Sequence, residues 1–571
     1  MRWYRWAAFA VLNWGALTIV GAEDILPLIH AQGAQLATEQ GPIQLKGVNL
    51  GGWLLQETWM SPVKGSQDHW TTRDLLTKRF GLAKAEELFR VYEDHWINEW
   101  DLDRIQALGF NVVRVPFGYW NLQSEGGDWH RTASGAIDFG RLDWIVNQCG
   151  ARGIYVILDL HGAPGFASDE HSSGKVKASR LFAKSPEGET FRTRTIDLWK
   201  EVARHFHGNG TVAAYDLLNE PMAKPDDRTL WDLYDRIYQA IRTVDADHLI
   251  SVEAIWDLAN LPPPQDYSWK GMLYQTHNYG WDKDQGPFVD SKIQMASLAY
   301  QWGVPVYVGE FTAFQKYSDW DQTLAKYDNA GFQWTTWTWK LAKQGTTSWA
   351  LYSGTFVASP DVESDSYETI LTDWTDTETS SDNFTFNQYL MGALAKSLAR
   401  PPYPKALPAA VSGAGAAVPS PDTVRYEAEK AQIVLSAFHR PGLPDGTESQ
   451  GFFSGQLAAA GLNSALTADQ VKADWSNLPH VRFQVTVPKA GTYRLTLAYN
   501  GDDDKTILVR VGAGKNLPVS LPSLSGGTWN VVHTKDLPVT LAQGTTDILV
   551  SGTLANQGWE NIDYIELTPQ G

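Results

Sequence analysis

The sequence predicts an α/β protein, in which a (β/α)8 TIM barrel is followed by an all-β sandwich. Over the first 400 residues, eight strand-like runs alternate with helical patterns. Near residue 400 the composition changes to Pro, Ala, Gly and Ser, and only short strand-like runs with turn signals follow. The 571 residues are too many for one ordinary domain, so a large core with an appended module is expected.

The first residues are typical of a secretory signal. Arg2 and Arg5 give a positive start, an apolar stretch follows, and the small residues Gly21 and Ala22 precede two acidic residues. We expect residues 1–22 to be a signal peptide. The alternative is an uncleaved membrane anchor.

Residues 23–399 are predicted to form the barrel, because several runs are continuously apolar, as in parallel strands covered on both faces. The predicted strands are 43–50, 111–117, 154–161, 212–220, 248–254, 272–278, 304–310 and 332–339. Helical patterns are clearest at 141–153, 195–206 and 229–244. A doubly wound sheet is the alternative, but "NLGGWLLQE" poorly matches the glycine-rich phosphate turn such a sheet would carry.

The remainder of the chain is predicted as a linker and a second domain. Residues 400–421 are rich in Pro, Ala, Gly and Ser without an apolar period, which is typical of a linker. Residues 422–571 contain short strands such as "VRFQVTV" and "IDYIEL" and no convincing helical pattern, so a β-sandwich is expected.

Composition excludes several classes of partner and site. The net charge of -18 makes nucleic acid and anionic membranes poor partners. The single cysteine, Cys149, excludes an intrachain disulfide and a cysteine-based metal site. The 26 Trp residues favour carbohydrate as substrate, because indole rings stack on sugars as well as filling cores. We expect a secreted or periplasmic protein.

Two predicted strands end in a carboxylate. "AAYDLLNEP" (213–221) ends with Asn219, Glu220 and a proline, and "VPVYVGEF" (304–311) carries Glu310. A mid-strand charge would lose its hydration, whereas at the C-terminal end of a barrel strand it can face the active-site mouth. Glycoside hydrolysis needs two such carboxyls. The alternative is that each merely caps its strand through a salt bridge.

Within residues 43–340, the chain carries in this order the motifs "NVVRVPFGYW", "DLHGAPG", "YDLLNEP", "QTHNYG", "VYVGEF" and "WTTWTWK". Together they resemble the strand-end motifs of glycoside hydrolase family 5, a retaining family on a (β/α)8 barrel. "LKGVNLGGWLLQETW" (45–59) is similar to the opening of its exo-β-1,3-glucanase branch.

The resemblance implies roles around the two carboxylates. Glu220 matches the acid/base and Glu310 the nucleophile. Arg114 matches an arginine that keeps Glu310 ionised, since a positive neighbour favours the carboxylate. Tyr279 would bond Glu310, and His277 would lie near Glu220. A plain barrel salt bridge for Arg114 and a satisfied core histidine for His277 are the alternatives.

It also implies contacts to the sugar. Asn219 matches the amide that bonds the sugar 2-hydroxyl, and His161 the histidine that contacts the bound sugar. Trp337 matches the platform under the reacting sugar, with Trp339 as second choice. Glu57 matches a first-loop carboxylate that bonds a terminal glucose. The alternative for His161 and Trp337 is that they belong to the core.

Two departures leave the linkage open. "QETWM" stands where the glucanase branch usually has Pro after Glu, and the long acidic segment 340–383 is expected to lie over the barrel mouth.

The C-terminal domain resembles carbohydrate-binding module families 35 and 6, through "RYEAEKAQI" and "GWENIDYIEL". This implies a structural Ca²⁺ held by Glu427, Glu429 and Asp563, since calcium prefers oxygen ligands. Trp559 and Asn561 match the sugar site of the module, unless Trp559 is a core residue.

The sequence thus predicts a secreted retaining β-glycosidase that acts on a β-glucan, with β-1,3 linkages favoured. Its partner is a polysaccharide or oligosaccharide, with no cofactor for catalysis, no membrane contact in the mature form and a monomeric state. The alternatives are another family 5 substrate (β-1,4-glucan, β-mannan or a β-1,6-linked glycan) and a non-catalytic glycan-binding protein.

Overall fold

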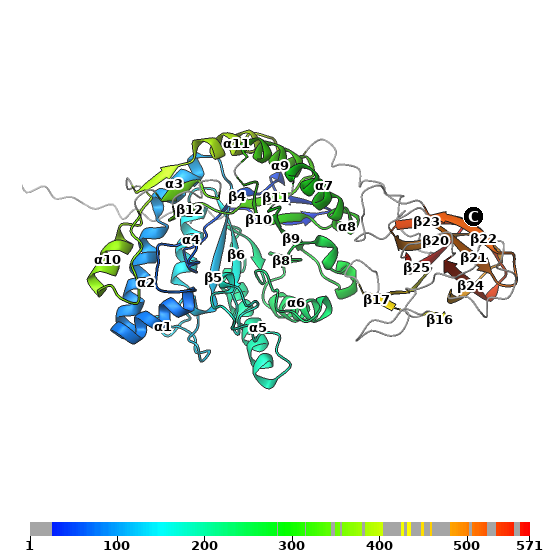
Figure 1. Ribbon diagram of the computed structural model, residues 1–571, viewed down its shortest axis with the longest axis horizontal. Helices are drawn as coiled ribbons and strands as arrows, with labels where there is room; N and C mark the ends of the chain where they lie inside the picture. The colour runs from blue at the N-terminus through cyan, green and yellow to red at the C-terminus, as the bar shows by residue number, and fades with distance from the viewer. Residues whose placement is uncertain are drawn as a thin grey trace, which may run out of the picture.

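The computed structural model of the protein describes residues 26–281, 284–314, 316–343, 349–354, 357–379, 383–403, 424–427, 431–434, 447–449, 457–459, 480–501, 505–521, 533–552 and 560–570. Its larger part is a closed barrel of eight parallel strands with helices around it (Figure 1). The strands follow one another around the ring in chain order, and the last pairs with the first. The (β/α)8 prediction is confirmed, and the open doubly wound sheet is excluded.

The barrel strands are β4 (Lys46–Asn49), β5 (Val112–Gly118), β6 (Tyr155–Gly162), β7 (Val212–Asp216), β8 (Leu249–Glu253), β9 (Met272–Tyr279), β10 (Val306–Thr312) and β11 (Gln333–Thr336). Each overlaps one predicted run. The run 212–220 was predicted too long, because β7 ends at Asp216 and Glu220 lies four residues further on. The run 43–50 contains two strands, since β3 (Gly41–Ile43) precedes β4.

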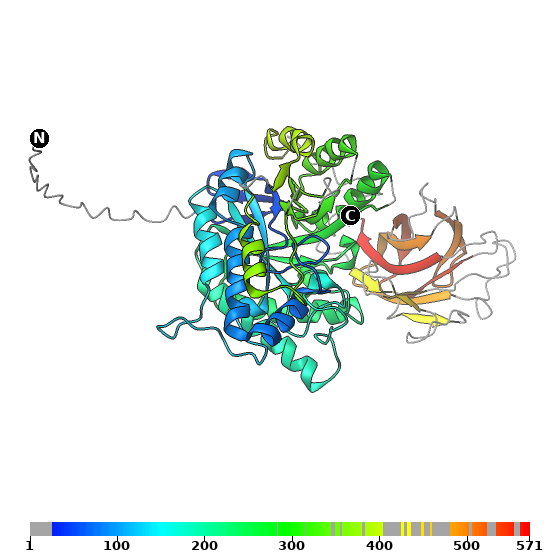
Figure 2. The same cartoon turned by 60° about the vertical axis from the view of Figure 1, so that its left-hand side comes forward.

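Helices surround the barrel in both views (Figures 1 and 2). They are α1 (His69–Phe80), α2 (Leu82–Trp96), α3 (Glu99–Ala107), α4 (Gly140–Gly150), α5 (Pro186–Phe206), α6 (Asp227–Arg242), α7 (Gln285–Met295), α8 (Ser297–Gln301), α9 (Tyr317–Asn329), α10 (Tyr367–Thr375) and α11 (Gln388–Leu398). Helix α6 shows why they form. The Asp226 side chain caps its first turn by accepting the Thr229 N–H, and its apolar residues at three- and four-residue steps are buried.

One barrel unit departs from the α-helical pattern. Between β8 and β9, residues 254–271 contain two short 3₁₀ helices, η3 (Leu258–Asn260) and η4 (Pro264–Tyr267). Prolines 262 to 264 explain this, because proline removes the N–H groups that an α-helix needs. Three-residue 3₁₀ turns also follow β5 and β6, as η1 (Tyr119–Asn121) and η2 (His171–Ser173).

A small antiparallel sheet, made of β1 (His30–Gln32), β2 (Gln35–Thr38) and β3, closes the N-terminal end of the barrel. Leu36 of this sheet shares an apolar cluster with Val112 and Tyr307, which stand near the N-terminal ends of their strands. The other end of the barrel is therefore the open one, where residues after each strand can meet.

The acidic segment 340–383 is only partly where the sequence placed it. Strand β12 (Lys340–Leu341) pairs with β13 (Tyr352–Gly354), which pairs with β14 (Phe384–Phe386). Helix α10 packs on α2 at the outside of the barrel, where Trp374 contacts Tyr92. The expectation that the whole segment covers the mouth is therefore wrong. It failed because the apolar side of α10 has a partner on α2.

The predicted linker begins later than residue 400. Arg400 makes a salt bridge of 2.8 Å to Asp328, and the hydroxyl of the buried Tyr403 accepts the Leu36 N–H at 2.6 Å. Residues 400–403 therefore belong to the barrel domain. Residues 404–423 lie outside the described part, as do residues 1–22 with the predicted signal peptide. Among the described residues, no helix combines the length and apolar character that a membrane crossing requires.

The C-terminal part consists of two antiparallel sheets, as predicted. Their inner faces share one core that includes Phe483, Leu495, Ile548 and Ile565. One sheet contains β15 (Val424–Glu427), β17 (Thr447–Ser449), β18 (Leu457–Ala459), β20 (Gly491–Gly501), β23 (His533–Leu541) and β25 (Glu560–Pro569). The other contains β16 (Gln432–Val434), β19 (His480–Val487), β21 (Lys505–Val511), β22 (Leu517–Leu521) and β24 (Gly544–Gly552).

The backbone brings part of the predicted calcium set together. Glu427 of β15 stands opposite Tyr564 of β25, next to the buried Asp563. Glu429 and the predicted sugar-stacking Trp559 lie outside the described residues, and Asn561 is placed in β25 by its backbone.

Candidate active site

A single buried arginine organises the inside of the barrel. Arg114 lies in the middle of β5 rather than at its end, and its side chain is fully buried. Its nitrogens contact Asp216 (2.9 Å), Glu310 (2.8 Å), Asn219 (2.9 Å), Asp159 (3.2 Å) and Asn49 (3.2 Å). Burial would lower its pKa, but the charges of Asp159, Asp216 and Glu310 outweigh burial and raise that pKa. A permanent positive charge thus stands beside Glu310.

Glu310 is held from two sides. It lies in β10, at a point where the pairing with β9 shifts register between Val308 and Glu310. Arg114 Nη1 donates to Oε1 at 2.8 Å, and the Tyr279 hydroxyl donates to Oε2 at 2.8 Å. Donors on both oxygens favour the ionised carboxylate, which is the form a nucleophile requires.

Glu220 lies beyond the end of β7 on a strained piece of backbone. Its φ angle is 39°, in the left-handed region that non-glycine residues rarely adopt. Its N–H donates to Glu253 Oε2 at 2.8 Å, and its own Oε1 lies 2.9 Å from His277 Nδ1. The local structure therefore directs the carboxyl group to His277 and Glu310.

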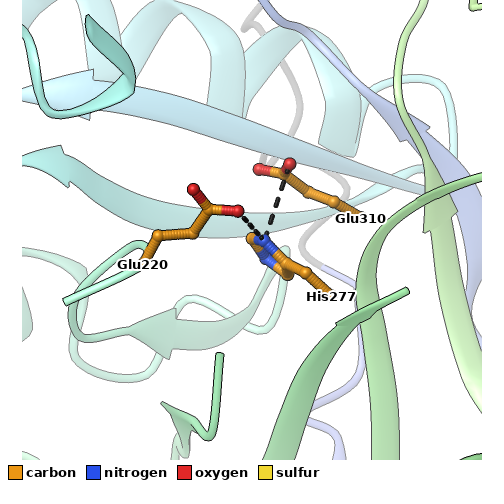
Figure 3. A group of neighbouring side chains, drawn as sticks. All are labelled: Glu220, His277 and Glu310. Carbon is orange, nitrogen blue, oxygen red and sulfur yellow. Dashed lines mark hydrogen bonds and ion pairs between the residues drawn. The ribbon is translucent and has the colours of Figure 1, made fainter. Parts of the chain in front are cut away.

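The two carboxyl groups meet around the imidazole. Figure 3 shows His277 between Glu220 and Glu310, whose Oε2 is 3.6 Å from Nδ1. One oxygen of Glu220, one oxygen of Glu310 and a ring nitrogen of His277 all lie within 4.8 Å of one another. The sequence prediction that Glu220 and Glu310 converge at the barrel mouth agrees with this geometry.

Electrostatics separates the protonation states of these groups. Burial, with the charge of Glu57 adding to it and the charges of His161 and Arg114 opposing it, raises the pKa of Glu220 to about 7. Burial also lowers the pKa of His277 to about 3, so that imidazole is neutral at neutral pH. Glu220 can therefore hold a proton beside Glu310, whose two oxygens accept hydrogen bonds from Arg114 and Tyr279. Two carboxyls with opposed environments are typical of an acid/base assignment.

His161 and Trp337 form a stacked pair beside the carboxyls. Their rings are 5.8 Å apart and inclined by only 13°. Asp159 Oδ2 lies 2.6 Å from His161 Nδ1; burial would lower the pKa of His161, but Asp159 outweighs burial and raises it. Trp337 is 3% exposed, so only an edge of its surface remains for a ligand.

Asn219 is oriented by Arg114. The guanidinium has only donors, so the amide oxygen must face it, as the 2.9 Å contact to Oδ1 shows. The amide nitrogen consequently points away from Arg114.

Glu57 lies in the loop after β4 and is tied to two partners. Its Oε2 accepts the Trp59 Nε1–H at 2.8 Å and is 3.0 Å from His171 Nε2. Burial would raise the pKa of Glu57, but the hydrogen bond and charge of His171 outweigh burial and lower it. The same bond raises the pKa of His171. Glu57 is therefore a buried carboxyl paired with a histidine whose pKa is raised by the same contact.

Aromatic rings continue outward from the carboxyls. Trp349 contacts Trp59 at 5.4 Å, Tyr279 at 5.6 Å and Trp281 at 5.6 Å between ring centroids. Phe314 packs against Trp281 and Trp349, and Trp281 is 64% exposed. Within the described residues of segment 340–383, Trp349 reaches the mouth through its contact with Tyr279.

Trp339 cannot be the platform. Its ring is fully buried, and its Nε1–H donates to Asp101 at 2.8 Å in the packing around α3. The second choice for the platform was wrong. Both Trp337 and Trp339 lie beyond the end of β11 at Thr336, so strand alternation does not set their directions, and Trp339 packs against Tyr352 and Asp101 instead.

Several residues at the site were missed from the sequence. Asp159, Asp216, Glu253, His171 and Trp349 all contact predicted site residues. A signal existed for Asp159, Asp216 and Glu253, since each is an acid near the end of an apolar strand run. His171 and Trp349 come from loops, where no periodicity indicates a direction.

The group Glu220, His277 and Glu310 is the one cluster with metal-ligand spacing among the residues that the structure describes. Its environment fits a divalent cation poorly, because Arg114 already supplies a positive charge to Glu310 and Glu220 is partly protonated near neutral pH. Catalysis without a cofactor stays a prediction.

The chain is similar to known proteins over the barrel. The cellulase family, glycosyl hydrolase family 5, matches residues 81–343. A β-xylosidase of Phanerodontia chrysosporium is 30% identical over 300 residues, which cover 50% of this chain and 61% of the relative. A probable glucan 1,3-β-glucosidase A of Aspergillus niger is 30% identical over 341 residues, covering 55% of this chain and 77% of the relative.

Among solved structures, Cel5A of Thermotoga maritima in complex with mannotriose is 17% identical, with a TM-score of 0.40, and covers 62% of this chain and 97% of that one. The match to the Aspergillus relative, together with the family match over the barrel, shows to which family the protein belongs. The chain belongs to glycosyl hydrolase family 5.

Proposed function

We propose that the protein is a retaining β-glycosidase that removes glucose from β-1,3-linked glucan. One observation carries the retaining mechanism: an oxygen of Glu220 lies within 4.8 Å of an oxygen of Glu310. Retaining enzymes hold their carboxyls roughly 5–5.5 Å apart, whereas inverting enzymes need roughly 6.5–9.5 Å to admit a water molecule between sugar and base.

In the first step, Glu310 attacks the anomeric carbon and forms an ester bond as the glycosidic C–O bond breaks. Glu220 donates its proton to the departing oxygen, so the leaving group departs as a neutral alcohol. Arg114 and Tyr279 keep Glu310 ionised until it attacks. Glu220 is left as a carboxylate.

In the second step, Glu220 takes a proton from a water molecule, which attacks the same carbon. The ester bond to Glu310 breaks, the sugar keeps its β configuration, and both carboxyls return to their starting states. His277 is suited to hold Glu220 in both steps, because a neutral ring protonated on Nδ1 donates to Oε1 and leaves the other carboxyl oxygen for the proton.

The substrate assignment rests on Glu57 and on the names of relatives. A buried carboxylate tied to Trp59 and His171 can accept hydroxyl hydrogen bonds from a terminal sugar, which favours release of single units. The relative in Aspergillus niger is named as a probable glucan 1,3-β-glucosidase. A second candidate is hydrolysis of β-xylosides, which is favoured by the β-xylosidase named in Phanerodontia chrysosporium.

Product analysis tests both parts of the proposal. Proton NMR of the first minutes of reaction is expected to show the β-anomer, and first-formed α-anomer would contradict retention. The substrates are laminarin, laminari-oligosaccharides, cellulose, mannan, a β-1,6-glucan and xylo-oligosaccharides. Single glucose units from the laminarin series support the proposed function, whereas preferred cleavage of xylo-oligosaccharides supports the second candidate.

A further inference from the structure

Glu253 is a buried carboxyl at the end of β8 that the mechanism above does not use. Its side chain is fully buried, and Oε2 accepts the N–H of Glu220 at 2.8 Å. Oε1 lies 3.6 Å from His277 Nδ1 and has no hydrogen-bond partner within the described residues. Burying a carboxyl group without full hydrogen bonding costs free energy, so the position of Glu253 requires an explanation.

The backbone of Glu220 needs a fixed partner. Its φ of 39° is a conformation that an L residue adopts only when its surroundings enforce it. The next residue, Pro221, has no N–H to donate, and no strand ladder reaches this point because β7 ends at Asp216. The bond from the Glu220 N–H to Glu253 is thus a principal constraint on how the acid/base enters the site.

Glu253 is itself held rigidly. Tyr234 of α6 accepts the Glu253 N–H at 3.3 Å and donates its hydroxyl hydrogen to the Glu253 carbonyl oxygen at 3.1 Å. Two residues later, the Ile255 carbonyl oxygen accepts the His277 N–H at 2.7 Å. The tip of β8 therefore fixes the backbones of both Glu220 and His277 relative to one another.

We propose that Glu253 is the positioning residue of the acid/base: it holds the Glu220 backbone so that the carboxyl aims its proton at the departing oxygen. This inference rests on the proposed function of Glu220. Burial, reinforced by the charges of Glu220 and Asp216, raises the pKa of Glu253 well above its usual range. A neutral carboxyl accepts the Glu220 N–H without placing another negative charge beside Glu310.

The test uses leaving groups of different acidity, because only poor leaving groups need a proton. We compare kcat/KM on an aryl β-glucoside with an acidic phenol and on an alkyl β-glucoside, for the full chain and its variants. The ratio of the two values does not depend on how much of a sample is folded. Glu253→Met keeps the length of the side chain and removes the acceptor.

Glu253→Met is expected to lower the alkyl-glucoside value at least about tenfold more than the aryl-glucoside value, since general acid catalysis contributes about 10²–10⁴-fold. Glu253→Gln, which retains an acceptor oxygen and resembles the neutral carboxyl, should leave the ratio close to that of the wild type. Equal losses on both substrates in Glu253→Met, or a Gln variant as damaged as the Met variant, would overturn the inference.

Asp245→Asn is the matched control. Asp245 is a buried carboxyl that precedes β8 at the other end of the barrel, where it bonds His248 and Tyr215. This change should lower stability without altering the leaving-group ratio. Glu220→Ala separates the two proposals: it must show the same selective loss if Glu220 is the acid/base. If Glu220→Ala loses kcat/KM selectively on the alkyl glucoside but Glu253→Met does not, the positioning role of Glu253 is rejected and the role of Glu220 stands. If Glu220→Ala shows no selective loss, both the role of Glu220 and that of Glu253 are rejected.

Discussion

Arg114 Nη1 lies 2.8 Å from Glu310 Oε1 inside the barrel, and both side chains are buried. The same guanidinium contacts Asp159 and Asp216, so one positive charge compensates three carboxyl groups. Such a cluster is stable only while its cation is present, because removing one partner leaves uncompensated buried charge. The pair thus links the stability of the barrel to the ionisation of Glu310.

Arg114→Met should therefore destabilise the protein strongly, by about 3–5 kcal/mol, because it leaves the buried carboxyl groups without their cation. Arg141→Met is the control. Arg141 pairs with Glu93 and Asp94 near the surface and should change stability by no more than about 1 kcal/mol. Denaturant unfolding measures both. Equal stability of the two variants would mean that Arg114 does not hold the carboxyl cluster together.

Glu310→Ala and Glu220→Ala should each abolish most activity on glucans without unfolding the protein. Loss of the acid/base alone costs about 10²–10⁴-fold in rate. Glu201→Ala, which removes an exposed salt bridge to Arg204 on α5, should retain full activity. Initial rates measure the loss of activity, and circular dichroism checks that each variant is folded. Near-normal turnover in either site variant would refute the assignment of Glu220 and Glu310 as the catalytic pair.

The pH dependence follows from the raised pKa of Glu220. The general acid must be protonated, so kcat/KM should be maintained below about pH 7 and fall as pH rises through that value. The folded-state pKa exceeds the unfolded one, so the stability this carboxyl contributes is complete below its ordinary pKa and is lost as the pH rises from there to about 7. On an activated aryl glycoside, Glu220→Gln should lack this alkaline limb. If the alkaline fall in kcat/KM persists unchanged in this variant, it is caused by the titration of another group.

Glu57→Gln should lower activity on laminari-oligosaccharides by roughly ten- to a hundredfold, since hydrogen bonds to a charged group contribute roughly 1.5–3 kcal/mol. The change also removes the charge that pairs with His171. His171→Gln tests that contribution separately and should have a smaller effect. Chromatography of early laminarin products provides the check on exo action: mixed oligomers in place of glucose would show that Glu57 does not end the site.

We also propose that the C-terminal module binds Ca²⁺ through Glu427, Glu429 and Asp563. The register that sets Glu427 beside Tyr564 brings two of these acids to neighbouring strands. Calorimetry of the full chain should show a calcium-dependent rise in the Tm of one transition, because a ligand that binds only the native state stabilises it. Mg²⁺ at equal concentration is the control. No shift with millimolar Ca²⁺, or the same shift in Glu429→Gln, would remove this proposal.

Particular residues show how far sequence patterns reach. The eight apolar runs predicted the barrel because buried parallel strands repeat a recognisable composition. Glu220 and Glu310 could be predicted as site residues because a charged side chain next to a buried apolar strand is costly to bury unless it faces a cleft. Glu253, an acid in the same kind of position, was overlooked because its partner is a backbone N–H, which leaves no mark in a sequence.

By itself, the sequence determined the fold class and the order of the strands, and it predicted that Glu220 and Glu310 meet at the barrel mouth, since these depend on local composition and spacing. Only the tertiary structure decided that Glu220 stands at a positive φ beyond its strand, that Trp339 faces the helices, and that α10 packs on α2 while Trp349 reaches the mouth. These features depend on contacts between residues far apart in the chain. Their energy comes from burial and hydrogen bonding across elements, which no local pattern records.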